Sequence, residues 1–318
     1  MNGMAIFTGN ANPALAKNIC ECLKKPLTKV IVGRFSEGEV RVQIQENIRG
    51  KDVFIVQPTC PPSNDNLMEL LILMDAARRA SANRITAVLP YYGYARQDRK
   101  DQPRVPITAK LIANMIWVAG ANRVLAMDLH ASQIQGFFDI PVDHLYAINT
   151  LCDYIDRKKM DSAKMVVVSP DVGGVKMARA YAKRLRAGLA IVDKRRMSPE
   201  KIEVMHILGD VKGKVAVIVD DIVATAGSMI EASESLQKKG VTSVIALISH
   251  GILSGNALER IKNCSIIKEV IISDSIPFEK AKGNPKIKVV SIAPLLAEAI
   301  QRIHNEESVS SLFEYPKV

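Results

Sequence analysis

The sequence predicts an α/β fold of two similar domains, each built on a mainly parallel sheet flanked by helices. Short runs of Val, Ile and Leu alternate with longer amphipathic segments along the whole chain. Aromatic residues make up only 5% of the chain, which favours α/β layers over a β-sandwich. The length of 318 residues suits two domains of about 150 residues each.

In the first half, apolar runs and alternating patterns predict strands, and apolar residues at helical spacing predict helices. The predicted strands are residues 40–44, 52–56, 84–89 and 123–127. The predicted helices are residues 64–81 and 107–118.

The second half repeats this scheme. Its predicted strands are residues 165–168, 189–192, 215–219, 241–248, 270–272 and 287–290. Its predicted helices are residues 175–186, 228–239 and 293–304. We therefore expect domains at residues 1–147 and 148–304, with ligands bound beyond the carboxyl ends of the strands.

The charge of the chain points to an anionic partner. The net charge is +10, which suits a nucleic acid, a membrane surface or a phosphorylated small molecule. The basic residues are spread along the chain, and no RNA-binding aromatic motif or zinc-finger spacing is present, so we do not expect a nucleic-acid partner. No stretch approaches the ~18 apolar residues of a membrane span, so we expect no membrane partner.

The cysteines indicate a reducing compartment. There are five of them, without CxxC pairs, which argues against a disulfide framework and against a zinc site. The N-terminus lacks the basic start and apolar run of a signal peptide. We expect a cytoplasmic protein with buried, inert thiols.

The sharpest local pattern is an apolar strand that ends in Asp220 and Asp221 and continues through a loop of small residues into a helix. The loop residues are Ala224, Thr225, Ala226, Gly227 and Ser228. Backbone N–H groups at a helix N-terminus suit a phosphate, Thr225 and Ser228 add hydroxyl donors, and Gly227 permits close approach. Carboxylates would repel a phosphate but accept hydrogen bonds from a vicinal diol. The motif therefore indicates a sugar phosphate; the alternative is a pair of solvated aspartates before an ordinary turn.

Several further motifs, taken with this loop, resemble one enzyme family. They are residues 34–39 (RFSEGE), 94–99 (YARQDR), 127–130 (MDLH), 169–174 (SPDVGG), 193–196 (DKRR) and 305–313 (NEESVSSLF). In this order they resemble the phosphate-activated class of ribose-phosphate pyrophosphokinases, which have the type I phosphoribosyltransferase fold. The resemblance covers essentially the whole chain. It implies two phosphoribosyltransferase-like domains.

The same resemblance implies the reaction. The pyrophosphoryl group of Mg-ATP passes to the anomeric hydroxyl of ribose 5-phosphate, giving phosphoribosyl pyrophosphate and AMP for nucleotide, histidine and tryptophan biosynthesis. By the same resemblance Asp220, Asp221, Arg196 and the loop from Ala224 to Ser228 bind ribose 5-phosphate.

The resemblance also implies an ATP site in the first half. Its residues are Phe35, Glu37, Gly38, Glu39, Arg96 and Gln97. Phe35 can stack on adenine, Gln97 can hydrogen-bond the purine edge, and Arg96 can pair with phosphate. Without the resemblance, Phe35 would be interpreted as a core residue.

Metal and catalytic residues follow in the same way. The family places His130 and Asp171 at the Mg²⁺–ATP site, although Mg²⁺ prefers oxygen ligands and a lone histidine is more often structural. Lys194 and Arg196 match a mobile catalytic loop that neutralises charge on the transferred group; composition alone indicates a solvated turn. The Walker motif of other kinases is absent.

The polar C-terminus matches a regulatory anion site of the family. The tail of about residues 305–318 is expected to pack back on the first domain, and Ser308, Ser310 and Ser311 to join Asn47 and Arg49 there. Phosphate is the expected activator and ADP the expected inhibitor at this site, in a homohexamer. From sequence alone, a frayed and solvated end remains the alternative.

The chain departs from the family pattern at three places. Ala224 stands where many members have Asp, residues 101–103 replace a more basic stretch, and residues 197–200 follow the catalytic pair with less basic character. We expect Ala224 to be tolerated, because the loop grips phosphate mainly through backbone N–H groups. The last two departures affect expectations for regulation and loop dynamics more than for activity.

Three other functions remain open. An ordinary phosphoribosyltransferase would leave the first half unexplained, and a catalytically silent regulatory relative would be expected to lack Lys194, Arg196, Asp220 or Asp221. A nucleic-acid binder would show a steep salt dependence of affinity.

Overall fold

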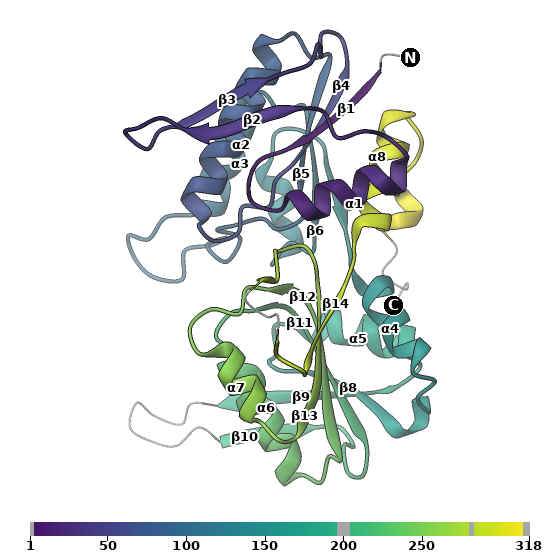
Figure 1. The fold of residues 1–318 in the computed structure, drawn as a ribbon. Helices are drawn as coiled ribbons and strands as arrows, with labels where there is room; N and C mark the ends of the chain where they lie inside the picture. Colours follow the sequence, from purple (N-terminus) through teal and green to yellow (C-terminus); the bar gives the residue numbers. More distant parts are fainter. Residues whose placement is uncertain (1–2, 196–203, 280–282, 314–318) are drawn as a thin grey trace. The chain divides into compact units, whose positions relative to one another are not determined.

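The computed structural model describes residues 3–195, 204–279 and 283–313, and it confirms the predicted α/β fold (Figure 1). The chain forms two compact units. Unit 1 runs to Tyr146 and also includes Ser275–Pro277 and Ser291–Phe313. Unit 2 comprises Ala147–Asp274 and Phe278–Val290.

Unit 1 contains a five-stranded parallel sheet in the order β1-β4-β5-β6-β7. Its strands are β1 (Met4–Thr8), β4 (Asp52–Val56), β5 (Arg84–Leu89), β6 (Arg123–Met127) and β7 (Val142–Leu145). A separate antiparallel hairpin consists of β2 (Val30–Arg34) and β3 (Val40–Ile44). It packs on helix α2 (Ser63–Arg79).

Helices cover the unit 1 sheet. They are α1 (Pro13–Leu23), α2 (Ser63–Arg79), α3 (Thr108–Ala119), α8 (Ala293–His304) and the short η1 (Ser132–Phe137) and η4 (Ser310–Leu312). Apolar side chains of α2 and α3 share one core with the inward residues of β1, β4, β5 and β6. Helices α1 and α8 pack against each other, as Figure 1 shows.

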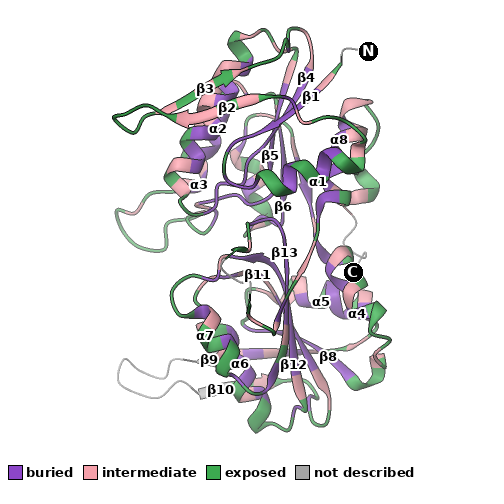
Figure 2. Ribbon diagram, in the orientation of Figure 1, coloured by how far each residue is buried: buried purple, intermediate pink, exposed green. Residues whose placement is uncertain are grey.

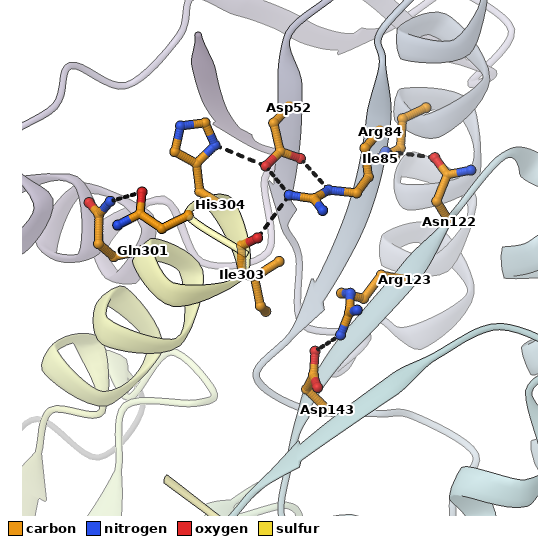
Figure 3. A network of polar contacts seen from close by, with 10 residues as sticks. Asp52, Arg84, Ile85, Asn122, Arg123, Asp143, Gln301, Ile303 and His304 are labelled. Carbon is orange, nitrogen blue, oxygen red and sulfur yellow. Dashed lines mark hydrogen bonds and ion pairs between the residues drawn. The ribbon is translucent and has the colours of Figure 1, made fainter. Parts of the chain in front are cut away.

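Helix α8 corrects the expected domain limits. We expected residues 293–304 in the second domain, but α8 lies in unit 1. A polar network explains this placement (Figure 3). The buried carboxylate of Asp52 accepts hydrogen bonds from Arg84 Nε at 2.9 Å and contacts His304 Nδ1 at 3.0 Å, and Arg84 Nη2 donates to Ile303 O at 2.9 Å.

Unit 2 contains a seven-stranded sheet in the order β10-β9-β8-β11-β12-β13-β14. Its strands are β8 (Met165–Ser169), β9 (Gly188–Arg195), β10 (Val204–Leu208), β11 (Val215–Val223), β12 (Ser243–Gly251), β13 (Ile267–Ser273) and β14 (Ile287–Val290). Neighbouring strands are parallel except β9 and β10. The sheet is therefore mainly parallel, as predicted.

Both faces of this sheet carry helices. They are α4 (Ile148–Arg157), α5 (Val175–Leu185), α6 (Gly227–Lys238), α7 (Ala257–Asn263) and the short η2 (Ser162–Lys164). Helices α6 and α7 share a core with alternate residues of β8, β11 and β12, while α4 and α5 pack together. The central strands are consequently buried along most of their length, as Figure 2 shows.

The thiols agree with the expectation of inert cysteines, with one exception. All five are free, and burial raises the pKa of Cys20 and of Cys60 to about 11 and that of Cys152 to about 12. Cys22 is exposed, so the prediction that the thiols are buried is wrong there. Among the described helices, none is both long and apolar enough to cross a membrane.

Candidate functional site

Asp220 and Asp221 lie inside β11 rather than after it, because the strand continues to Val223. Successive strand residues point to opposite faces, and the two side chains differ accordingly. Asp221 is buried and Asp220 is partly buried. The N–H of Asp221 donates to Oδ1 of Asp220 at 2.9 Å. The pair therefore forms a compact acidic feature near the carboxyl end of the strand.

The charge of Asp220 is unfavourable where it lies. Burial, the charge of Asp221, a hydrogen bond with Asp221 and the charge of Asp171 raise its pKa well above the ordinary value. Asp171 follows β8, which is the parallel neighbour of β11. Three carboxylates thus lie near the same edge of the sheet, where they can accept hydrogen bonds from hydroxyl donors.

Asp171 also organises its own loop. Its Oδ1 accepts the N–H of Gly174 at 2.9 Å, immediately before α5 begins. Its backbone oxygen accepts the hydroxyl of Ser169 at 2.7 Å. The carboxylate is exposed and keeps lone pairs for a further partner.

The loop after β11 forms the start of α6, which begins at Gly227. The residue with left-handed geometry is Ala226, at φ 61° and ψ 4°, and not the glycine. An ideal Cβ on Gly227 would lie 3.5 Å from Arg260 Nη1, which is ordinary contact. The first turn of α6 nevertheless presents N–H groups without helical acceptors, as the sequence predicted.

The predicted catalytic pair is only partly within the described residues. The backbone of Lys194 lies in β9 and pairs with Met205 of β10. Arg196 and the departing residues 197–200 lie outside the described residues. The backbone places Lys194 near the end of a strand that neighbours β8.

In unit 1, residues 34–39 form the tip of the β2–β3 hairpin. Phe35 and Glu39 pair across it, with Phe35 N donating to Glu39 O at 2.8 Å, and Gly38 adopts φ 95° in the turn. Phe35 is 49% exposed, so it is no core residue. The guanidinium of Arg41 lies 5.9 Å from the ring centroid. Because about half of the Phe35 side chain is exposed, the ring is available for stacking.

Neighbouring contacts hold this hairpin in place. Arg34 Nη2 forms an ion pair with Asp65 of α2 at 2.8 Å. Glu37 is exposed, and a hydrogen bond from Ser36 lowers its pKa, so it remains a carboxylate.

Arg96 and Gln97 follow β5 in a tight turn in which Gln97 N donates to Tyr94 O at 3.0 Å. The hydroxyl of Thr108 donates to Gln97 Oε1, which orients the amide. Both predicted side chains are exposed. They can therefore meet a ligand without displacing core residues.

His130 follows β6 in a turn that β7 supports. Asp128 has φ 36° and donates its N–H to Leu145 O at 2.9 Å. The next N–H, that of Leu129, donates to Nε2 of the buried His144 at 2.9 Å. Sequence reasoning missed His144, because its role depends on the pairing of β6 with β7.

No metal site is formed by protein side chains alone in the described part of the chain. No three His, Cys, Asp or Glu side chains there are close enough to hold an ion. His130 belongs to unit 1 and Asp171 to unit 2. A metal at either residue would need ligands from a bound molecule, as is common for Mg²⁺.

The predicted regulatory residues all belong to unit 1. Asn47 Oδ1 accepts the N–H of Arg49 at 3.0 Å, and both residues are exposed. In the tail, Ser308 and Ser310 join through their hydroxyls at 3.1 Å. Arg302 of α8 donates to Ser308 O at 3.1 Å and to Ser311 Oγ at 2.6 Å. Arg302 is a cation that sequence reasoning did not include.

The chain matches known families along most of its length. Residues 4–120 match the model of the N-terminal domain of ribose phosphate pyrophosphokinase, and residues 195–314 match that of the phosphoribosyl synthetase-associated domain. A ribose-phosphate pyrophosphokinase of Campylobacter jejuni is 54% identical over 98% of this chain and 100% of its own. One from Rhizobium meliloti is 56% identical over the same shares.

A solved structure agrees with these relatives. Phosphoribosylpyrophosphate synthetase from Mycobacterium smegmatis superposes with a TM-score of 0.91 at 41% identity. The match covers 96% of this chain and 100% of that chain.

Proposed function

Because the chain belongs to the ribose-phosphate pyrophosphokinase family, we propose that the clusters described above are the substrate sites of a single enzyme. It forms phosphoribosyl pyrophosphate and AMP from ribose 5-phosphate and ATP. The anomeric hydroxyl attacks the β-phosphorus of ATP; an O–P bond forms to the sugar, the bond to the AMP oxygen breaks, and the hydroxyl proton is released.

The acidic end of β11 carries this proposal. Asp220 and Asp221 lie near the carboxyl end of β11, and two residues separate Asp221 from the small-residue loop that opens α6. Carboxylates accept hydrogen bonds from sugar hydroxyls, while the N–H groups at the helix start bind the 5-phosphate. The two halves of the motif thus fit the two halves of ribose 5-phosphate. Ala224 supports this role as well as Asp would, because the loop binds through its backbone.

In unit 1 the ATP site is proposed at the hairpin tip and the turn after β5. The exposed ring of Phe35 stacks on the adenine, and the amide of Gln97 donates to its edge. Arg96 pairs with phosphate oxygens. Glu37, Gly38 and Glu39 complete the loop.

Mg²⁺ is the proposed cofactor. Asp171 of unit 2 and His130 of unit 1 are the residues proposed for it, each acting with phosphate oxygens of ATP. The carboxylate of Asp171 is exposed and keeps lone pairs for a metal ion. When bound, Mg²⁺ would neutralise charge on the phosphates. Lys194 and Arg196 offset the negative charge that develops during transfer.

Regulation and assembly are also proposed. The residues Asn47, Arg49, Ser308, Ser310 and Ser311 form an anion site at which phosphate activates and ADP inhibits. A homohexamer is proposed from the family, and exposed apolar residues of α3 (Leu111, Trp117 and Val118) support a subunit contact. The free thiols support a cytoplasmic location.

One assay tests the reaction. Purified protein is incubated with ribose 5-phosphate and Mg-ATP, and AMP is measured separately from ADP. AMP and phosphoribosyl pyrophosphate are expected in equal amounts, with Mg²⁺ required. Stoichiometric ADP would contradict the proposal.

A further inference from the structure

Three consecutive carbonyl groups of the loop that opens α6 accept hydrogen bonds from another segment of unit 2. Val223 O accepts the N–H of Leu253 at 3.1 Å, and Ala224 O accepts the N–H of Ser254 at 2.9 Å. The third carbonyl, Thr225 O, accepts Nη1 of Arg260 at 3.1 Å. All three donors come from the segment that leads from β12 into α7.

These hydrogen bonds set the direction of the loop N–H groups. The C=O and N–H of a trans peptide point in opposite directions. With carbonyls 223–225 facing the α7 segment, the N–H groups of residues 224–226 face the other way. No hydrogen bond joins the N–H of Thr225 or Ala226 to a backbone acceptor of the described chain. Together with the first N–H groups of α6 they form one donor surface.

Side chains just before β14 hold helix α7, which carries Arg260. Lys286 Nζ donates to Ile261 O at 3.1 Å and to Cys264 O at 2.7 Å, at the C-terminal end of α7. Asn284 Nδ2 donates to Leu258 O at 3.0 Å. A cation at the C-terminal end of a helix also interacts favourably with the helix dipole. The short helix α7 therefore holds Arg260 at a defined position.

The guanidinium lies on the carbonyl side of the loop. Its Nη1 donates to Thr225 O, in the peptide before Ala226, and lies 3.5 Å from the position of an ideal Cβ on Gly227, the residue after it. Ala226 is the left-handed residue at which the chain turns into α6. Arg260 thus contacts the loop where the orientation of its peptides is decided.

We propose that Arg260 is a positioning residue for the 5-phosphate of ribose 5-phosphate. It does so by holding the Thr225 carbonyl away from the ligand, and its charge adds to the positive potential of the loop. The proposal rests on the proposed function only for the identity of the ligand. Nothing in the sequence motif at residues 220–228 includes this arginine, which lies more than thirty positions further along the chain.

The test compares Arg260→Met, Arg260→Lys and Arg78→Met. Arg78 is a matched control because its Nη1 also donates to a backbone carbonyl, Val118 O, at 3.1 Å, but in unit 1. For each protein, the affinity for ribose 5-phosphate is measured by calorimetry without nucleotide. The affinity for the Mg complex of α,β-methylene-ATP, both KM values, kcat and Tm are measured beside it.

Arg260→Met should weaken ribose 5-phosphate binding about threefold to tenfold, the scale of one net hydrogen bond. Binding of the ATP analogue should stay within twofold. Arg260→Lys, which keeps the charge, should give a smaller loss, and Arg78→Met should leave both affinities unchanged.

Two results would overturn the proposal: ribose 5-phosphate affinity unchanged in Arg260→Met, or equal losses for both ligands. Failure of the proposed function is distinguishable. A wild-type protein that binds ribose 5-phosphate but releases no AMP would refute the reaction, while the Arg260 comparison would still stand. A wild-type protein that does not bind ribose 5-phosphate would refute both.

Discussion

At the scale of single residues, Asp220 shows a conflict between stability and ligand binding. Its raised pKa means that folding favours the protonated form. The destabilisation is therefore absent below the pKa of the unfolded chain and grows as the pH rises through the folded pKa. A residue that costs stability at neutral pH and lies beside a proposed sugar site is typical of function.

Asp220→Asn is therefore expected to raise Tm by a few degrees at pH 7.5, because the unfavourable charge is removed. At pH values below about 4, where the unfolded carboxyl is also protonated, the gain should vanish. The same variant should weaken ribose 5-phosphate use by about 10-fold or more, because a charged acceptor is lost. Thermal melts across pH and KM values for both substrates measure this.

Asp210→Asn is the control for this variant. Asp210 is exposed, and a hydrogen bond and ion pair with Lys214 lower its pKa. Its replacement should not raise Tm, since exposed ion pairs contribute little. Equal Tm gains from both variants would contradict the burial argument, and equal losses for ribose 5-phosphate and ATP would contradict the sugar role.

Lys194→Ala should lower kcat by at least about 100-fold, the scale of one transition-state charge contact. Binding of ribose 5-phosphate should change far less. Single-turnover rates and calorimetry separate these effects, with Lys288→Ala of β14 as the control. A nearly unchanged kcat would identify Lys194 as an ordinary surface lysine.

At the scale of secondary-structure elements, β7 supports the turn that carries His130. The imidazole of His144 must be neutral at Nε2 to accept the Leu129 N–H. This side chain and the Leu145 carbonyl together hold two successive N–H groups next to a strained Asp128. The support thus acts directly on the proposed Mg-ATP residues.

His144→Ala should lower kcat/KM for Mg-ATP about tenfold, because a buried N–H loses its acceptor. His144→Gln should recover most of the loss, since the glutamine oxygen can replace Nε2. Asn122→Ala is the matched control: Asn122 Oδ1 accepts the Ile85 N–H at 2.8 Å in the same unit (Figure 3). Its kinetic constants should not change. No rescue by glutamine would argue against the positioning role.

The C-terminal tail is a second element with a predicted effect. Ser308→Ala combined with Ser310→Ala should weaken phosphate activation while turnover at saturating phosphate stays nearly intact. Arg49→Ala should weaken it more, because a charge-assisted contact is lost. Activity against phosphate concentration, with and without ADP, measures this. Full activity without phosphate and plain competition of ADP with ATP would refute the regulatory site.

Several elements were predicted well because their residues form apolar runs or apolar stripes at regular spacing. Strands β4, β5, β6 and β14 and helix α8 have the predicted limits. Helix α1 was missed although Asn12 caps it and Pro13 begins it. Strands β7 and β10 were missed because their residues form too little of an apolar or alternating pattern. Strand pairing rather than composition determines them.

The candidate site residues divide in the same way, into those that a local sequence pattern reveals and those that it does not. Residues within one motif, such as Asp220 and Ser228, were proposed from the sequence because their chemistry lies in nearby positions of the chain. His144, Arg260 and Arg302 were not, because they act through contacts that exist only once distant segments have folded together. Ala226 shows a subtler limit: the motif contains a glycine, yet the left-handed geometry falls on the residue before it.

At the scale of the whole molecule, the first unit is completed by the last helix of the chain. The buried Asp52 connects β4 with Arg84 of β5 and His304 of α8. The tail residues follow directly after α8. Asp52 therefore contributes to holding α8, and the tail that follows it, on unit 1.

Asp52→Ala should lower Tm by at least about 5 °C, because it leaves the other groups of a buried ion network without their partner. Phosphate activation should weaken as well. Asp75→Ala is the control, since Asp75 also accepts from two arginines but at an exposed site. Its Tm should change by less than about 2 °C. Equal shifts for the two variants would contradict the argument.

The return of α8 to unit 1 also has a consequence for biosynthesis. Residues up to Tyr146 leave the ribosome long before residues 291–313 are made. At about 5–20 residues per second the delay is roughly 10–30 s. During this time the surface of α1 that α8 will cover is open to chaperones and proteases. A chain released before residues 291–313 are made would lack α8, and the surface of α1 that packs against it would stay uncovered.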